Sequence, residues 1–160
     1  MKKVIVHTDG ACSGNPGKGG YGLILQYGNS KKEESEGYEL TTNNRMELLA
    51  VIRSLELLTR DNCDVVIYSD SKYVVNAVEK GWVFGWVKKN FKGKKNPDLW
   101  KRFLNVYKKH TVKFEWVKGH AGNEMNERAD ILATKALTKE ILKEDTGYTP
   151  ELSQDDLFSE

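Results

Sequence analysis

The order of secondary-structure patterns along the chain restricts the fold more than any other feature. Three strand-like segments near the N-terminus, 3–8, 21–27 and 33–40, are joined by glycine-containing turns and predict an antiparallel meander. Two short strand patterns follow, at 65–69 and 111–117, and these alternate with helical patterns. A meander followed by alternating strands and helices predicts an α/β fold with a mixed five-stranded sheet covered by helices.

The helical pattern at residues 43–58 predicts a buried central helix, because its apolar residues extend nearly all round. Thr42 or Asn43 can cap its N-terminus, and Ser71 can cap the next helix. The remaining helices are predicted at 72–78, 81–89, 99–108 and 126–142.

The length of 160 residues suits one domain with its own core. We expect this domain to span 1–143, followed by a partly ordered tail, 144–160, that carries six acids and no Lys or Arg. No apolar run approaches the roughly 18 residues of a membrane span, and no signal peptide is evident. Cys12 and Cys63 form no metal-binding spacing, which favours a reduced, cytoplasmic protein. Nothing specifies an oligomer or a protein partner, so we expect a monomer.

Charge is distributed unevenly along the chain. The net charge is +2, yet residues 80–118 hold twelve Lys or Arg against two acids, so the rest of the chain is acidic. A basic lobe beside an acidic body favours a polyanion as ligand. A solvated lysine-rich face is the alternative explanation.

Four acidic residues stand where the predicted elements could bring them together: Asp9, Glu47, Asp70 and Asp130. Two lie at strand ends, one in the first turn of the central helix, and one beside the apolar stripe of the last helix. Converging carboxylates repel one another, so such a cluster persists mainly when hard cations neutralise it. Without Cys or His ligands beside them, the cation should be Mg²⁺ or Mn²⁺. Two such ions about 4 Å apart clamp a phosphodiester, which predicts a metal-dependent nuclease.

Five segments that carry or flank these acids resemble, together and in order, the type 1 ribonuclease H family, especially its bacterial members. They are TDGACSGNPGKGGYG, TTNNRMEL, SDSKYV, WVKGHAGN and NERADILA, and the resemblance spans 3–148. It implies a ribonuclease H-like fold and an endonuclease that cuts the RNA strand of RNA/DNA hybrids, leaving 5′-phosphate and 3′-hydroxyl ends. It also implies two Mg²⁺ ions per active site, for which Mn²⁺ can substitute, held by Asp9, Glu47, Asp70 and Asp130.

The resemblance implies a catalytic role for one histidine. His120, in KGHAGN, matches the active-site histidine of the family, which assists the leaving group or product release. We interpret His7 and His110 as residues without a catalytic role. Glu127 lies one turn before Asp130, and an indirect role at the site or a place on the helix surface are both open.

Substrate contacts are also implied by the resemblance. Recognition of an RNA strand requires groups that contact ribose 2′-hydroxyls. The residues that match those of the family in this role are Gly10, Ala11, Cys12, Asn15, Asn43 and Asn44. Turn and cap chemistry would explain the same residue types, and both roles can hold together. Residues 81–97 match the basic protrusion that straddles the DNA strand, with Trp86, Lys88 and Lys89 as contacts. Trp82 could be a further contact, but we interpret it as a core residue.

The chain departs from the family pattern at three places. Lys72 stands where many relatives have Gln, which would exchange a groove contact for a phosphate contact. Thr42 and Asn96 suggest a phosphate pocket, but Leu40 stands where relatives often have Arg, so we expect a weaker pocket. The 91–98 loop also looks short.

Three other functions fit parts of the pattern. An integrase-like nuclease would share the acidic cluster, but the Asn43-Asn44 pair and the basic protrusion argue against it. A non-catalytic hybrid-binding module would not need all four carboxylates and His120. A calcium-binding structural protein would gather its acids in one loop, whereas here they are dispersed.

Overall fold

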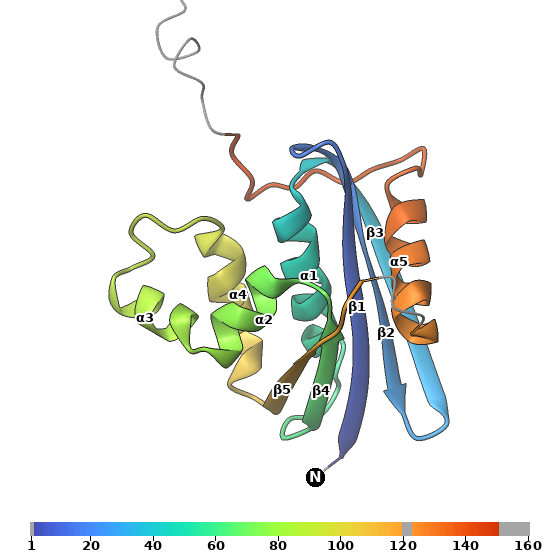
Figure 1. Cartoon of the computed structure of the whole chain (residues 1–160), viewed down its shortest axis with the longest axis vertical. Helices are drawn as coiled ribbons and strands as arrows, with labels where there is room; N and C mark the ends of the chain where they lie inside the picture. The colour runs from blue at the N-terminus through green and yellow to red at the C-terminus, as the bar shows by residue number, and fades with distance from the viewer. Residues whose placement is uncertain (1, 120–122, 151–160) are drawn as a thin grey trace, which may run out of the picture.

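The computed structural model describes residues 2–119 and 123–150 (Figure 1). Its strands and helices follow in the order β1 (Lys3–Ser13), β2 (Gly17–Tyr27), β3 (Ser30–Thr41), α1 (Asn43–Glu56), β4 (Asp64–Ser69), α2 (Lys72–Glu79), α3 (Trp82–Lys88), α4 (Pro97–Tyr107), β5 (Thr111–Trp116) and α5 (Glu124–Ala136). The sheet order is β3-β2-β1-β4-β5. The first three strands pair antiparallel, whereas β1–β4 and β4–β5 are parallel. The predicted α/β fold with a mixed five-stranded sheet is confirmed.

The glycine-rich segment after Asp9 is strand rather than the predicted turn. β1 continues to Ser13, which pairs with Lys18 of β2, so the turn is confined to residues 14–16. The glycines in these strands allow a helix to pack closely on the sheet. A Cβ on Gly22 would lie 2.4 Å from the carbonyl oxygen of Ala129, so its absence lets α5 pack directly on β2.

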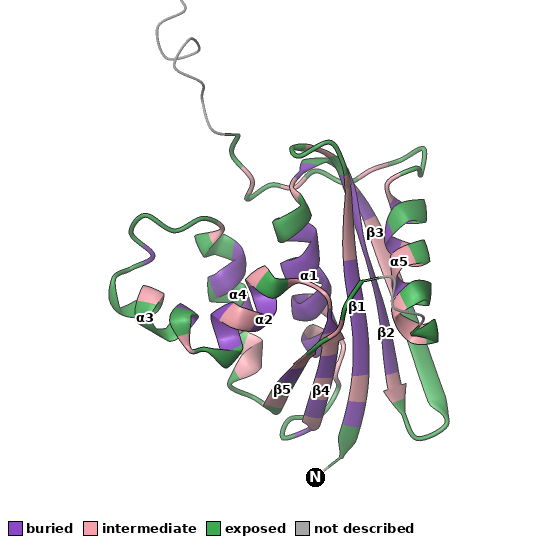
Figure 2. Ribbon diagram, viewed as in Figure 1, coloured by how far each residue is buried: buried purple, intermediate pink, exposed green. Residues whose placement is uncertain are grey.

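Helices cover both faces of the sheet, with α1 on one face and α5 on the other (Figure 1). Most of α1 is buried, as Figure 2 shows, which confirms the predicted central helix. Thr42 is its N-cap, because the Thr42 hydroxyl accepts a hydrogen bond from the Arg45 N–H at 3.3 Å. The core beside α1 is completed by α4, which buries Trp100 and Phe103 completely.

The last described residues return to the sheet. α5 ends at Ala136 rather than at the predicted residue 142, because Lys143 pairs with β3: its N–H donates to the Gly37 carbonyl, and its carbonyl accepts from the Glu39 N–H. The start of the predicted tail therefore packs on the domain as far as residue 150, and the boundary at 143 stays a prediction. Among the described residues, no helix has the length and apolar character that a membrane crossing requires.

Candidate active site

Three carboxylates converge at the carboxyl end of β4, beside the middle of β1. Asp9 lies in β1, Asp70 directly follows β4, and Glu47 lies just past the first turn of α1 rather than in that turn as predicted. One carboxylate oxygen from each lies within 4.8 Å of the others. Asp9 is 9% exposed and Glu47 is 4% exposed. The structure thus brings together, from three separate elements, three of the four acids that the sequence selected.

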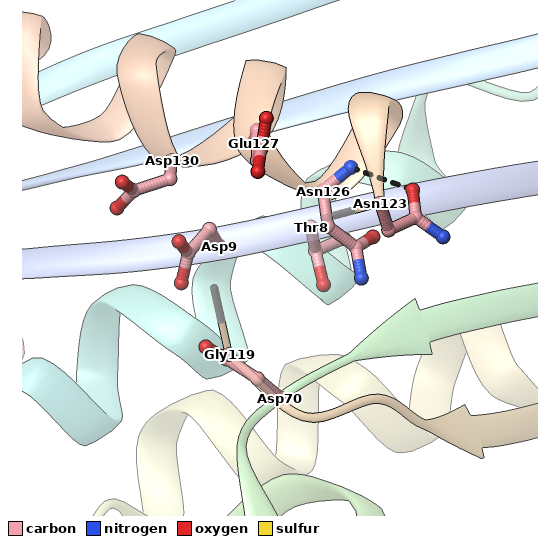
Figure 3. A pocket seen from close by; sticks show the side chains of 8 residues that line it. All are labelled: Thr8, Asp9, Asp70, Gly119, Asn123, Asn126, Glu127 and Asp130. Atoms are coloured by element: carbon pink, nitrogen blue, oxygen red, sulfur yellow. Dashed lines mark hydrogen bonds between the residues drawn. The ribbon is translucent and has the colours of Figure 1, made fainter. Parts of the chain in front are cut away.

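The fourth acid, Asp130, lies beside this group rather than within it. Ala129 and Ala133 of α5 are fully buried against the sheet, and this packing holds Asp130 beside Asp9 of β1. The carboxyl groups of Asp9 and Asp130 point in the same direction (Figure 3). All four acids line a cleft of about 450 Å³, so Asp130 can contribute to the same site.

The electrostatics of the cluster favour a bound cation. Burial, with smaller contributions from hydrogen bonding to Asp130 and from the charge of Asp70, raises the pKa of Asp9 to about 7, although a hydrogen bond with Glu47 opposes it. Burial and the neighbouring Asp9 raise the pKa of Glu47 well above its usual range. Both shifts are the expected response of carboxyl groups that share a site without a counter-ion.

One buried oxygen also lacks a partner. Oε2 of Glu47 accepts no hydrogen bond from any described residue. A buried polar atom without a hydrogen-bond partner lowers the stability of the fold. A hard divalent cation takes carboxylate oxygens as ligands and would neutralise the cluster. The donor set therefore fits Mg²⁺ or Mn²⁺.

Predicted substrate contacts line the same cleft. Gly10, Asn43, Asn44 and Lys72 all border it, together with Ser71 and Tyr73, which the sequence analysis did not select. Tyr73 belongs to the same SDSKYV segment as Asp70, so helical spacing could have indicated it. The Nζ of Lys72 lies 5.1 Å from the ring centre of Trp116.

The other predicted contacts at the β1 turn lie beside the cleft. Asn15 Oδ1 accepts a hydrogen bond from the Asn43 N–H at 3.1 Å, which ties the turn to the start of α1. Ala11 is half-buried in β1. The Cys12 thiol lies 3.5 Å from the Thr41 carbonyl, and burial raises its pKa. Cys12 and Cys63 are both free thiols.

A second pocket of about 580 Å³, here called the Thr42 pocket, adjoins the cleft. Asn15, Thr42, Asn44, Lys95 and Asn96 are among the residues that line it. Asn44 borders both cavities, so they form one continuous surface. The amide of Asn96 is held in place, because its Oδ1 accepts from Arg45 Nη1 at 3.2 Å and its Nδ2 donates to the Tyr73 hydroxyl at 3.1 Å.

The basic protrusion, residues 81–97, consists of α3 and the following loop (Figure 1). The interpretation of Trp82 as a core residue is wrong, since Trp82 is 49% exposed. Val83 is the buried residue of α3, and successive helical positions diverge by about 100°. Trp86 is half-buried, and its ring packs edge to face on that of Trp100, with the ring centres 5.7 Å apart. Lys88 and Lys89 are exposed at the end of α3.

A cavity of about 20 Å³ beside Asp9 is lined in part by residues that the sequence did not indicate as site residues. Thr8, Asn123 and Asn126 line it together with Glu127, whose role the sequence left open (Figure 3). Asn123 caps α5 by accepting from the N–H groups of Met125 and Asn126, both at 3.1 Å. Because the sequence placed the start of this helix at Asn126, the cap was missed.

Two of the three histidines, His7 and His110, lie among the described residues. His7 Nδ1 lies 2.6 Å from Asn126 Oδ1, its ring stacks on Tyr68, and burial lowers its pKa. His110 Nδ1 accepts from the Cys63 N–H at 3.1 Å. These contacts are structural for both. His120 lies outside the described residues.

Comparison with known proteins supports the sequence resemblance. The family model described as RNase H matches residues 1–138. A ribonuclease H of Syntrophus aciditrophicus (strain SB) is 53% identical over 153 residues, which cover 92% of this chain and 88% of that protein.

Two solved structures are similar in fold. LC9-RNase H1, described as a type 1 RNase H with the type 2 active-site motif, aligns with a TM-score of 0.79 and 31% identity, over 86% of this chain and 73% of that one. LC11-RNase H1, solved in complex with an RNA/DNA hybrid, aligns with a TM-score of 0.61 and 26% identity, over 84% of this chain and 96% of that one. The chain therefore belongs to the RNase H family of ribonucleases.

Proposed function

We propose that this chain is an endonuclease that hydrolyses the RNA strand of RNA/DNA hybrids and leaves 5′-phosphate and 3′-hydroxyl ends. The convergence of Asp9, Glu47 and Asp70 in a cleft bordered by Asn43 and Asn44 carries the proposal. Family membership and the similarity to LC11-RNase H1, a protein solved with such a hybrid, support it.

In this proposal the four carboxylates hold two Mg²⁺ ions, for which Mn²⁺ can substitute. Asp9, Glu47 and Asp70 offer oxygens close enough to share ligation, and Asp130, which lines the same cleft, completes the set. Bound divalent ions of this kind activate water and stabilise the leaving oxygen of a phosphodiester.

The cleft wall would distinguish RNA from DNA. Gly10 allows the backbone of β1 to approach α1 closely, and the Asn43 and Asn44 amides can donate to and accept from ribose 2′-hydroxyls. Ala11 and Cys12 would extend this wall along β1, and Asn15 would extend it in the following turn, whereas Lys72 would contact a phosphate. These groups would hold the RNA strand with its scissile bond over the carboxylates.

The other strand would lie across the Thr42 pocket and the basic protrusion. The Thr42 hydroxyl and the Asn96 amide suit a phosphate in the pocket. Lys88 and Lys89 would neutralise further phosphates, and Trp86 would pack on a sugar or base. His120 retains the role that its motif implies, proton transfer to the leaving group or help with product release.

The proposal also includes a monomeric protein of the cytoplasm, with a domain at 1–143 and a tail at 144–160. Incubation with RNA/DNA, RNA/RNA and DNA/DNA duplexes, each with Mg²⁺ or with EDTA, tests the activity. We expect cleavage of the hybrid alone, in its RNA strand alone, and with metal alone. Cleavage of DNA/DNA at a comparable rate would move the protein to the integrase-like alternative.

A further inference from the structure

The segment 144–150 is fixed on the body of the protein. Asp145 accepts hydrogen bonds from Arg45 Nε at 2.7 Å and Nη2 at 2.9 Å, and from the Thr41 hydroxyl at 2.7 Å. The Tyr148 N–H donates to the Asp145 carbonyl at 3.1 Å, and the Tyr148 ring lies 5.8 Å from Arg45 Cζ. The path of the chain is therefore set as far as the last described residues.

The fixed segment ends beside the basic protrusion. Thr149 and Pro150 line the Thr42 pocket, and the same pocket is lined by Lys95 and Asn96 of the protrusion. The pocket in turn joins the carboxylate cleft through Asn44. Whatever follows Pro150 therefore starts at the surface that the proposed function assigns to nucleic acid.

The two segments that meet there carry opposite charges. Residues 151–160, here called the acidic tail, contain four acids and no Lys or Arg. The protrusion carries five lysines: Lys88, Lys89, Lys92, Lys94 and Lys95. Within the described parts of the chain, none of the first four forms an ion pair. Their charge is thus available to an added anionic group.

Chain length allows the contact within one molecule. Ten extended residues span up to about 35 Å, and the seven residue-to-residue steps from Lys88 to Lys95 span at most about 25 Å. Since Pro150 and Lys95 line one pocket, the acidic tail can reach every lysine of the protrusion. A short tether of this kind gives an effective concentration in the millimolar range, so weak ion pairs are sufficient.

We propose that the acidic tail docks on the basic protrusion of its own chain and competes with nucleic-acid phosphates for these lysines. The inference rests on the proposed function, in which the protrusion holds the substrate. The tail acts on substrate binding rather than on the chemical step, because the lysines lie outside the carboxylate cleft. The competition is electrostatic, so it weakens as salt concentration rises.

A charge-neutral tail tests the competition. In the variant Glu151→Gln, Asp155→Asn, Asp156→Asn, Glu160→Gln we expect KM for a hybrid to fall about threefold to tenfold at low salt, as for two or three weak ion pairs, with kcat unchanged. The difference should vanish at about 0.5 M salt. Its log KM should also depend more steeply on log salt, by about 0.7–0.9 for each lysine released. The variant Leu157→Ser, Phe158→Ser keeps every acid and should behave as the parent.

Carbodiimide cross-linking of the dilute full chain, without nucleic acid, gives a readout that does not depend on activity. Carboxylates of the tail should couple to lysines at 88–95 within one chain, and less so in high salt. Coupling only to lysines elsewhere, or only between chains, overturns the inference. If the parent cuts hybrids with the same KM as the charge-neutral variant, the tail proposal fails while the proposed function stands. If no hybrid is cut, the proposed function fails, and the cross-link map still decides where the tail docks.

Discussion

Gly10 and Glu47 are in direct backbone contact: a Cβ on Gly10 would lie 2.5 Å from the backbone nitrogen of Glu47 and 2.8 Å from the carbonyl carbon of Met46. The start of α1 therefore rests on β1 at the residue that follows Asp9. This contact fixes the distance between Asp9 and Glu47, and no longer side chain fits between the two elements.

Gly10→Ala should lower kcat by about 10²-fold, because displacement of α1 by about 1 Å would move Glu47 away from Asp9. The forced shift should also cost about 1–3 kcal/mol of unfolding free energy. Steady-state kinetics with a hybrid and urea unfolding measure the two effects. Gly85→Ala is the matched control, since, apart from the neighbouring residues and the backbone of α3 itself, nothing lies within 4 Å of its Cβ position. An active Gly10→Ala protein would show that α1 can shift without disturbing the site.

Asp9→Asn should stabilise the metal-free protein at high pH. The pKa of Asp9 is raised from 3.8 to about 7, mainly by burial. Protonated Asp9 therefore contributes stability that is fully present below pH 4 and is lost as pH rises through 7. Asparagine does not ionise, so the variant does not lose this stability at high pH. In EDTA at pH 8 we therefore expect its unfolding free energy to exceed that of the parent by on the order of 2 kcal/mol. Urea unfolding at pH 4.5 and pH 8 tests this, and equal differences at both pH values would contradict it.

Asp70→Asn should abolish turnover while hybrid binding survives. The substitution removes one ligand charge from the cluster, whereas most binding energy should come from the basic protrusion. Single-turnover cleavage and a binding titration in EDTA separate the two quantities. Near-normal rates at low millimolar Mg²⁺ would show that Asp70 is not a metal ligand.

The acidic cluster could be predicted from sequence because each acid stands at the end or on the inner side of a recognisable local element. The parallel pairing of β1 and β4 sets His7 opposite Tyr68, so Asp9 and Asp70, each two residues further along, lie side by side. The contact between Arg45 and Asp145 could not be predicted, because it joins residues 100 apart and no local pattern marks a partner at that distance. For the same reason the early end of α5 was missed, since it depends on Lys143 pairing with Gly37.

Replacement of Lys88, Lys89, Lys92, Lys94 and Lys95 together by Ala should raise KM strongly while kcat at saturating hybrid is largely preserved. The protrusion would hold substrate equally in the ground and transition states, so uniform binding is lost. Each lost phosphate contact should flatten the plot of log affinity against log salt by roughly 0.7–0.9. Trp86→Ala should weaken binding with little change in this slope, because its contact is packing. An unchanged slope in the lysine variant would make the protrusion a solvated face only.

Arg45→Met should cost about 3–5 kcal/mol of unfolding free energy, because Arg45 is 2% exposed and its loss leaves Asp98 and Asp145 without the cation that pairs with them. Burial acts to raise the pKa of Asp98, but the hydrogen bonds and charge of Arg45 outweigh it and hold this pKa below its usual value. The stability from this pair is therefore present above about pH 4 and is lost as pH falls further.

The difference between the parent and Arg45→Met should accordingly shrink between pH 7 and pH 3 in urea unfolding. Lys113→Ala is the control, since its exposed pair with Glu115 is worth at most about 1 kcal/mol. Arg45→Met should also release the segment around Asp145, because Arg45 holds that segment in place. Limited proteolysis should therefore cut near Tyr148 faster in Arg45→Met than in the parent. Equal cleavage rates in the two proteins would mean that Thr41 and the pairing of Lys143 hold the segment without Arg45.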